Sequence, residues 1–336
     1  MRIRKPRLAG EKQIEWFEED LELQVDSVLV RHVCTSPSIG TALHLYRNEH
    51  KQSNSVREER PFPYPWLQGF AYGCGEVVET GSEVSNLREG QLVYSMKLMA
   101  EEYVIPARDL TRLPEGLDPE SASMAFQVSV ALKSVQSAEI ALGDIVLVTG
   151  QGPIGIFAAQ FSRLAGAWQV ITTDLSDDKL RVSRACGADI TLNPRKDDIQ
   201  KSVLALTKGK GADVVIESSG SPQALTQCAQ AARKYARVAV IGWILDPWTI
   251  NLADDFTHKG LEMIICHSGV SGSWRQKIRG AQNADEMRAF IFDLMVSGRL
   301  RASQMITHRF PFKDLEKAWT FIESKPLDYL QVLLEN

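Results

Sequence analysis

The sequence lacks the cysteine spacing of a disulfide-bonded protein or a thiolate zinc site. Its 336 residues include five cysteines, which lie far apart, form no CxxC pair and total an odd number. Neither a disulfide framework nor a thiolate zinc site fits this pattern. The cysteines are therefore expected to be buried thiols that act as small apolar side chains.

Long apolar runs and a strong charge imbalance are also lacking. The N-terminal MRIRKPRLAGEK is basic but has no apolar core, which argues against a signal peptide or a membrane span. The formal net charge of −4 makes nucleic acid and anionic membranes poor partners. We therefore expect a cytoplasmic protein that acts on a small-molecule substrate.

The length of the chain favours two domains, and the pattern of apolar residues changes near residue 120. Residues 1–118 contain short β-type runs separated by turn residues, which predicts a β-rich domain. In residues 119–270, apolar strands alternate with helical stretches, which predicts an α/β fold with a doubly wound parallel sheet. Residues 271–336 are expected to supply the last helix of that domain and then return to the first one.

The most specific motif is VLVTGQGPIG, in which Gly150, Gly152 and Gly155 form GxGxxG between a buried strand and a helix. The first glycine permits a tight turn, the second lets a diphosphate approach the backbone, and the third lets the helix pack closely. Pro153 and Ile154 begin the helix whose amide groups would hold the diphosphate. This arrangement predicts a dinucleotide site.

The next strand, QVITTD, ends at Asp174. Its carboxylate would accept hydrogen bonds from the adenosine ribose and would repel a 2′-phosphate, so NAD(H) is the predicted cofactor. Lys179 and Arg181 lie close enough in sequence to keep NADP(H) open, and Lys179 is included among the candidate cofactor residues.

Several longer stretches carry a resemblance to a known family: GQGPIGIFAAQFSRLAGA, KGADVVIESSGSPQAL and ITHRFPFKDLEKAW. With the β-rich first domain, they make the chain similar to medium-chain dehydrogenases/reductases, above all the polyol and threonine dehydrogenase branch. A looser similarity, through SIGTxLxxYR, is to bacteriochlorophyllide dehydrogenase-like members. The resemblance implies a Rossmann domain beside a GroES-like catalytic domain, and a homodimer in which LEMIICHSG pairs across a two-fold axis.

The resemblance also implies further cofactor residues. Ser218, Ser219 and Gly220 match the segment beside the adenine side of the dinucleotide. Segments that flank the nicotinamide are matched by Gly242, Trp243, Ser268 and Gly269. Arg47 is close to the stretch that contacts the cofactor phosphates.

The metal ligands of the zinc-dependent relatives are replaced in this chain. Ile39 stands at the first ligand position and Phe126 at the last. The middle pair falls either on Phe70 and Ala71 or on Ala71 and Tyr72, because LQGFAYGCGEVVETG contains one extra residue. A catalytic zinc needs three ligands from Cys, His or carboxylate, so no metal is predicted.

Thr41 and His44 match the positions that relay the alcohol proton in zinc alcohol dehydrogenases. They form either a metal-free proton path or a structural remnant, because the loss of zinc removes the Lewis acid that the relay served. Tyr72 is a third catalytic candidate, and Tyr46, Arg47 and Lys97 are other possible donors to a developing alkoxide.

Aromatic residues at Tyr64, Trp66, Trp243 and Trp248 favour a substrate with a ring or apolar portion, or else belong to the core. The leading hypothesis is a zinc-independent, NAD(H)-dependent oxidoreductase that interconverts a secondary alcohol and a ketone. The alternatives are an ene-reductase acting on an activated C=C bond and a catalytically silent NAD(H)-binding protein.

Overall fold

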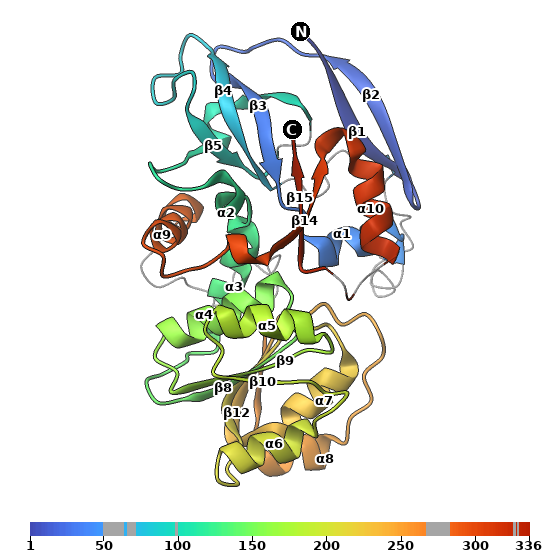
Figure 1. Cartoon of the computed structure of the whole chain (residues 1–336), viewed down its shortest axis with the longest axis vertical. Coiled ribbons are helices and arrows are strands. Elements are labelled where there is room, and N and C mark those ends of the chain that lie inside the picture. The colour runs from blue at the N-terminus through green and yellow to red at the C-terminus, as the bar shows by residue number, and fades with distance from the viewer. Residues whose placement is uncertain (50–63, 66–71, 98–99, 267–282, 325–326, 328) are drawn as a thin grey trace. The chain divides into compact units, whose positions relative to one another are not determined.

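The computed structural model describes residues 1–49, 64–65, 72–97, 100–266, 283–324, 327 and 329–336 (Figure 1). Contacts divide the chain into two units. The first, called the catalytic unit below, combines Met1–Phe126 with Arg288–Asn336. The second, the nucleotide unit, is Gln127–Met287.

The nucleotide unit is built on a parallel sheet of six strands in the order β10-β9-β8-β11-β12-β13. These strands are β8 (Ile145–Thr149), β9 (Gln169–Thr173), β10 (Ile190–Leu192), β11 (Ala212–Glu217), β12 (Ala232–Val240) and β13 (Glu262–Ile265). The order reverses between β8 and β11, which is the doubly wound topology. The α/β fold predicted from the alternation of strands and helices is confirmed.

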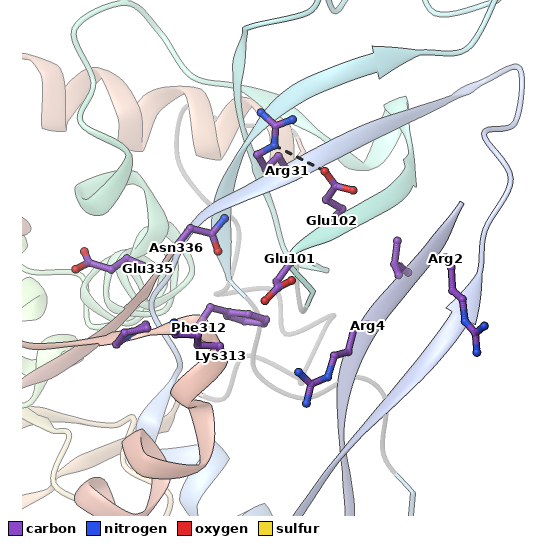
Figure 2. Close-up of a pocket in the computed structure, with 11 residues that line it drawn as sticks. Arg2, Arg4, Arg31, Glu101, Glu102, Phe312, Lys313, Glu335 and Asn336 are labelled. Atoms are coloured by element: carbon purple, nitrogen blue, oxygen red, sulfur yellow. Dashed lines mark ion pairs between the residues drawn. The ribbon is translucent and has the colours of Figure 1, made fainter.

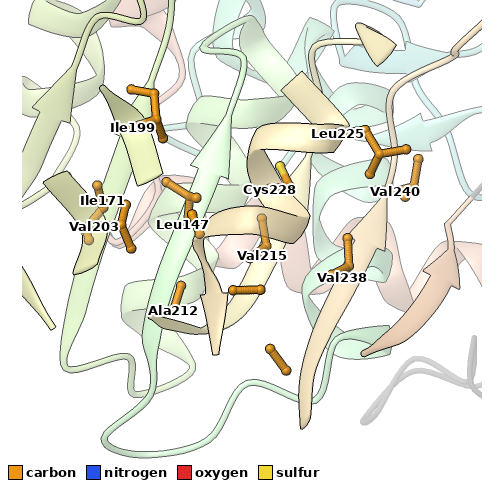
Figure 3. Packing of buried hydrophobic residues seen from close by; sticks show 13 residues of the cluster. Leu147, Ile171, Ile199, Val203, Ala212, Val215, Leu225, Cys228, Val238 and Val240 are labelled. Carbon is orange, nitrogen blue, oxygen red and sulfur yellow. The ribbon is translucent and has the colours of Figure 1, made fainter. Parts of the chain in front are cut away.

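Helices cover both faces of this sheet (Figure 1). The helices that contact its strands are α4 (Pro153–Leu164), α5 (Asp177–Ala185) and α7 (Pro222–Ala231), and α6 (Ile199–Leu206) packs on α7. The unit also contains most of α3 (Ala125–Ser137), α8 (Leu252–Asp255) and the 3₁₀ turn η3 (Thr257–Lys259). On the α6 and α7 face, Leu147, Val215, Val203 and Leu225 are at most 2% exposed (Figure 3). Because the central strands are covered on both faces, they are continuous apolar runs.

Side-chain caps fix where the helices of the nucleotide unit begin. The Ser176 hydroxyl accepts the Lys179 N–H, the Asp198 carboxylate accepts the Lys201 N–H, and the Ser221 hydroxyl accepts the Ala224 N–H. Each cap satisfies an amide that has no acceptor within its helix. The helix α4, which follows the glycine turn, begins at Gly152 without such a side chain.

The catalytic unit contains a sheet in the order β14-β15-β3-β4-β5-β7, with β6 paired to β3. Its strands are β3 (Ser27–Thr35), β4 (Gly73–Thr80), β5 (Leu92–Ser95), β6 (Glu102–Pro106), β7 (Thr111–Arg112), β14 (Ile306–Pro311) and β15 (Gln331–Glu335). The two C-terminal strands join this sheet because β15 pairs with β3 and β14 pairs with β15. Val28, Val30, Val77 and Val93 form the core beneath it, each at most 1% exposed.

A separate two-stranded ribbon, β1 (Arg2–Gly10) and β2 (Gln13–Asp20), precedes this sheet and was not expected from the sequence. Its cross-strand contacts include ion pairs, Lys5 with Glu19 at 2.5 Å and Arg7 with Glu15 at 2.9 Å, while Leu8 is buried in an apolar cluster. Such pairs stabilise antiparallel strands. Because many charged residues stand between the few apolar ones, the segment carries little strand signal in the sequence.

Helices also occur in the catalytic unit: α1 (Ile39–Tyr46), α2 (Pro119–Ser123), α9 (Ala284–Val296) and α10 (Leu315–Ser324), with the short 3₁₀ turns η2 (Ala107–Asp109), η5 (Ser303–Met305) and η6 (Phe312–Asp314). The boundaries between the two units fall inside α3 and α9. Helices α1 and α10 share one apolar cluster, where Tyr46 stacks on Trp319 at 5.6 Å between ring centroids. None of the described helices has the length and apolar character needed to cross a bilayer.

Candidate functional site

The glycine turn between β8 and α4 has a backbone that only glycine accepts at two of its positions. Gly150 has a φ of +80°, and a Cβ there would lie 2.7 Å from the Ser219 Cα. A Cβ on Gly155 would lie 1.8 Å from the Gly150 carbonyl oxygen. The turn is therefore fixed by backbone contacts before any ligand is considered.

Gly152 is different, because nothing lies within 4 Å of the place a Cβ would take. It is the N-cap of α4 and supplies no side-chain acceptor to the first turn of the helix, which continues through Pro153 and Ile154. Backbone N–H groups at such a helix start, together with the helix dipole, form an anion site. A diphosphate fits this arrangement.

Asp174 directly follows β9 and is held by two backbone amides. Its Oδ2 accepts the Gln151 N–H at 2.7 Å and its Oδ1 accepts the Ser176 N–H at 2.8 Å. The half-buried carboxylate is thus oriented by the glycine turn itself and keeps acceptor capacity for ribose hydroxyls. Lys179 and Arg181 are the two basic residues near Asp174 that could favour NADP(H) as the cofactor. Arg181 forms an exposed ion pair with Asp178, and Lys179 is half-buried in the first turn of α5.

Sequence reasoning overlooked the contribution of Gln151. Its side chain is fully buried, donates to the Val148 carbonyl at 3.1 Å and accepts from the Ser183 hydroxyl at 2.9 Å. These bonds hold the residue whose N–H binds Asp174. A glutamine between two motif glycines gives no sequence signal for this role.

The turn after β11 lies against the glycine turn. The Ser218 hydroxyl donates to the carbonyl oxygens of Thr149 at 2.7 Å and Gly150 at 2.8 Å. A Cβ on Gly220 would meet the Trp243 carbonyl oxygen at 3.0 Å. The structure therefore brings together the predicted cofactor residues at the carboxyl ends of β8, β11 and β12, where open α/β sheets bind ligands: Gly150, Ser218, Ser219, Gly220, Gly242 and Trp243. Ser268 and Gly269 lie outside the described residues.

In the catalytic unit, Tyr72, which the resemblance puts at a ligand position in one of its two alignments, contacts Phe126, the last ligand position. The rings of Tyr72 and Phe126 are stacked at 4.0 Å between centroids with an interplanar angle of 7°. Ser36 joins them to the strand that leads into α1: its N–H donates to the Tyr72 carbonyl at 3.0 Å, and its hydroxyl lies 2.6 Å from that of Ser123. The segments that hold Ile39, Tyr72 and Phe126 therefore converge.

The residues at this point do not fit zinc. Ile39 and Phe126 offer no donor atom, and Tyr72 offers a phenol instead of the imidazole, thiolate or carboxylate that a catalytic zinc requires. Phe70 and Ala71 are outside the described residues. Within the part of the chain that the structure describes, no three His, Cys, Asp or Glu side chains gather in a way that could hold a metal.

Burial raises the pKa of Tyr72 to about 12. The phenol is therefore protonated at neutral pH and can donate a hydrogen bond. Because one face of the ring is covered by Phe126, Tyr72 combines an apolar surface with a single polar atom.

His44 lies in the last turn of α1 and has an acidic partner that sequence reasoning missed. Its Nδ1 is 2.5 Å from the Glu49 Oε2, and because a carboxylate only accepts, the imidazole donates from Nδ1. Arg47 is engaged by two carboxylates, with 3.8 Å from its Nη1 to Glu49 and 3.6 Å from its Nε to Glu323. Thr41 lies in the same helix, but its side chain is outside the described part of the structure.

Several other candidates have structural partners. Tyr46 belongs to the α1–α10 core, Tyr64 packs against that core and donates to the Leu45 carbonyl at 3.2 Å, and Trp248 packs on the sheet core. Trp248 also donates to the Thr226 hydroxyl at 3.0 Å. These contacts of Tyr64 and Trp248 are those of residues packed in the core, the second of the two roles considered for them. Trp66 lies outside the described residues.

Lys97, another candidate donor, pairs with Asp109 at 2.7 Å on the surface. A groove of about 630 Å³ in the catalytic unit is likewise separate from the candidate site (Figure 2). Arg4, Arg31 and Lys313 line it, together with acidic residues. It includes none of the residues of the glycine turn or the Tyr72–Phe126 stack, so it has no part in the candidate site.

Comparison with known proteins adds the family. Residues 153–283 match the family described as zinc-binding dehydrogenase. The L-threonine 3-dehydrogenase of Bacillus subtilis (strain 168) is 31% identical over 259 residues, which cover 75% of this chain and 69% of that protein. The chain belongs to the medium-chain dehydrogenase/reductase family. The L-threonine 3-dehydrogenase of Pyrococcus furiosus is 29% identical over 329 residues, 88% of each protein.

Solved structures show the same fold. A short chain alcohol dehydrogenase from Escherichia coli CFT073, complexed with NADH, has a TM-score of 0.79 and 20% identity, covering 100% of this chain and 99% of that one. A dehydrogenase from Sinorhizobium meliloti 1021 bound to NADP has a TM-score of 0.78 and 22% identity over 100% of both chains. This medium-chain dehydrogenase is therefore an oxidoreductase of the alcohol, polyol and threonine dehydrogenase type, and its fold has been solved with either nicotinamide cofactor.

Proposed function

We propose that the chain is an NAD(H)-dependent, metal-independent oxidoreductase that interconverts a secondary alcohol and a ketone on a substrate with a ring or apolar portion. The stack of Tyr72 on Phe126 carries this proposal, because it supplies an apolar wall and one protonated phenol at positions that the resemblance matches to zinc ligands, Tyr72 in one of the two alignments. A site of this composition favours an apolar substrate and lacks the donors for a metal.

The cofactor part of the proposal rests on Asp174 and the α4 start. When bound, NAD(H) accepts or donates the hydride at the reacting carbon. The first-turn amides of α4 would hold its diphosphate, and Asp174, already oriented by Gln151 and Ser176, would accept from the adenosine ribose hydroxyls. A 2′-phosphate would meet the same carboxylate at a cost in electrostatic repulsion.

The oxygen of the substrate needs a hydrogen-bond donor in place of a metal. The Tyr72 hydroxyl supplies it, since its raised pKa keeps the proton in place until charge develops on the substrate oxygen. His44, which donates to Glu49 through Nδ1, and Thr41 are proposed as the residues that relay the alcohol proton.

The test combines metal analysis with turnover. Metal-analysed protein is titrated with NADH and NADPH by calorimetry and then assayed with ketones, enones and secondary alcohols. Ketone or alcohol turnover with NAD(H), undiminished by chelator, is expected. Bound zinc required for turnover contradicts the proposal; turnover of enones alone identifies an ene-reductase; NADH binding without any turnover identifies a silent binding protein.

Variants locate the chemistry and the cofactor preference. Tyr72→Phe keeps the ring stack and is expected to lower kcat about 10²-fold without changing the NADH Kd, in line with the loss of one oxyanion donor. Asp174→Asn is expected to weaken NADH binding about 10-fold, from the loss of charge-assisted bonds. Asp178→Asn, an exposed residue in the first turn of α5, is the matched control and is expected to bind NADH normally.

The edge strand β13 supports a homodimer. It ends the six-stranded sheet, and its Met263 and Ile265 side chains are 37% and 59% exposed. An exposed apolar edge can pair with a second copy across a two-fold axis. Light scattering is expected to give a dimer, and Ile265→Asp a monomer; a monomeric wild type contradicts this part of the proposal.

We also place this activity in the cytoplasm. All five cysteines are free, buried thiols, which suits a reducing compartment. Fractionation of the source cells tests it: activity recovered outside the cytoplasmic fraction contradicts the assignment.

A further inference from the structure

Glu217 is a buried carboxyl group at the centre of the nucleotide unit. It ends β11 and its residue is 0% exposed. Burial raises the pKa of Glu217. A buried carboxyl group is costly unless hydrogen bonds or a functional constraint retain it.

One oxygen of Glu217 organises the turn that follows it. Its Oε1 accepts the backbone N–H of Ser219 at 2.7 Å and of Gly220 at 3.0 Å, and also the Ser219 hydroxyl. The Ser219 hydroxyl in turn accepts the N–H of Ser221, the N-cap of α7, at 3.2 Å. The side chain therefore closes the turn on itself and fixes where α7 begins.

The other oxygen, Oε2, is buried and has no hydrogen-bond partner within the described part of the chain. A Cβ on Gly242 would lie 2.3 Å from it, so the carboxyl group fills the space that the glycine leaves. The Glu217 carbonyl accepts the N–H of Gly242 at 3.0 Å as well. Glu217 thus contacts both turns, after β11 and after β12, that the resemblance assigns to the cofactor.

The turn held by Glu217 is also the neighbour of the glycine motif. A Cβ on Gly150 would meet the Ser219 Cα at 2.7 Å, and one on Gly155 would meet the Ser218 hydroxyl at 2.7 Å. A displacement of Ser218–Gly220 would therefore change the packing against the glycine turn.

We propose that Glu217 is a positioning residue for the dinucleotide: its carboxyl group holds the Ser218–Gly220 turn against the glycine turn, so that cofactor affinity depends on a side chain buried beneath the site. This inference rests on the proposed NAD(H)-dependent function. It adds a residue that the glycine motif and the ribose-binding Asp174 leave out.

The experiment compares Glu217→Gln, Glu217→Asp and Glu217→Ala with wild type in the full-length protein. Calorimetry gives the Kd for NADH, and hydrogen exchange gives the protection of the Ser219 and Gly220 amides without cofactor. Gln keeps an acceptor oxygen at the same reach, so a Kd within about threefold of wild type is expected. Asp is one methylene shorter and Ala has no acceptor, so both are expected to lose amide protection and to raise the Kd about 10- to 100-fold.

Asp213 provides a matched control at the opposite end of the same strand. Its carboxylate accepts the Ile145 N–H at 2.8 Å and pairs with Arg233, away from the cofactor turns. Asp213→Ala is expected to lower the Tm while leaving the NADH Kd within about threefold. This result separates a loss of general stability from a loss of positioning.

Three outcomes overturn the inference. The first is a folded Glu217→Ala or Glu217→Asp protein with wild-type Kd and amide protection. The second is an Asp213→Ala protein whose Kd rises in step with its loss of Tm. The third is a wild type that binds neither NADH nor NADPH, which defeats the proposed function itself and is recognised before any variant is compared.

Discussion

The candidate sites of the nucleotide unit and the catalytic unit are built in different ways. In the nucleotide unit, backbone contacts at Gly150 and Gly155 leave no room for another residue type. In the catalytic unit, the segments around Ile39, Tyr72 and Phe126 still converge, but the side chains are apolar or aromatic. A site made by the backbone therefore restricts the sequence strictly, whereas a site made by side chains can keep its shape and change its chemistry.

The largest expected effect is on the glycine turn of the nucleotide unit. Gly155→Ala puts a Cβ 1.8 Å from the Gly150 carbonyl oxygen, and neither atom can move without disturbing the turn. We expect a loss of more than about 4 kcal/mol of unfolding free energy, measured with urea, together with loss of NADH binding.

Gly152→Ala is the control within the same motif. Its added Cβ has nothing within 4 Å, so the free energy of unfolding should change by less than about 1 kcal/mol while NADH affinity falls. Equal stability losses in the two variants would show that the close contact at Gly155 does not restrict the turn.

The second effect is acid destabilisation of the catalytic unit through His32. Burial lowers the pKa of His32 to about 4, and its ring nitrogens are bonded to Thr35 at 2.8 Å and to Asn336 at 3.2 Å. In the unfolded chain His32 is protonated below about pH 6.5, whereas in the folded protein it stays neutral until about pH 4. The free energy of unfolding is therefore highest above pH 6.5 and falls as the pH drops toward 4. The expected loss is about 3 kcal/mol.

Urea unfolding at pH 7 and pH 4.5 measures this loss. His32→Gln is expected to make the two free energies more nearly equal. His258→Gln, at an exposed histidine, should leave the pH dependence as it is in wild type. An unaltered pH dependence in His32→Gln would remove His32 as the cause.

The third effect concerns the stack of Tyr72 and Phe126 in the catalytic unit. Phe126→Leu removes the ring stacked on Tyr72 and should lower stability by about 1 kcal/mol and weaken substrate binding, leaving the NADH Kd unchanged. Phe290→Leu, at a 44% exposed position on α9, is the control and should change neither. A KM that stays at the wild-type value in Phe126→Leu would show that the stack does not form a substrate wall.

The smallest effect concerns the return of the chain to the catalytic unit. Arg309 on β14 forms a two-pronged pair with Glu120 on α2, at 2.6 Å and 2.7 Å. Because the pair is partly exposed, water and salt screen it, and Glu120→Gln should cost less than about 1 kcal/mol in thermal unfolding. A larger loss would mean that this pair fixes how β14 and α2 pack.

The sequence predicted the fold where signals are local. The alternation of apolar strands with helices gave the parallel sheet, and the glycine spacing gave the turn at Gly150–Gly155, because both depend on residues a few positions apart. The ribbon β1–β2 was missed, since charged residues that form cross-strand ion pairs stand between its few buried apolar residues.

What the sequence determined by itself is thus the fold class with its parallel sheet, the glycine turn, and the residue types at Ile39 and Phe126, which cannot bind a metal. Only the tertiary structure decided which side chains meet. The contacts of Tyr72 with Phe126, of Gln151 with Asp174, and of Glu217 with Ser219 and Gly220 are seen only once the strands are aligned. Turn geometry is encoded by a residue's own dihedral preferences, whereas a side chain's partner is set by packing between segments that are far apart in the chain.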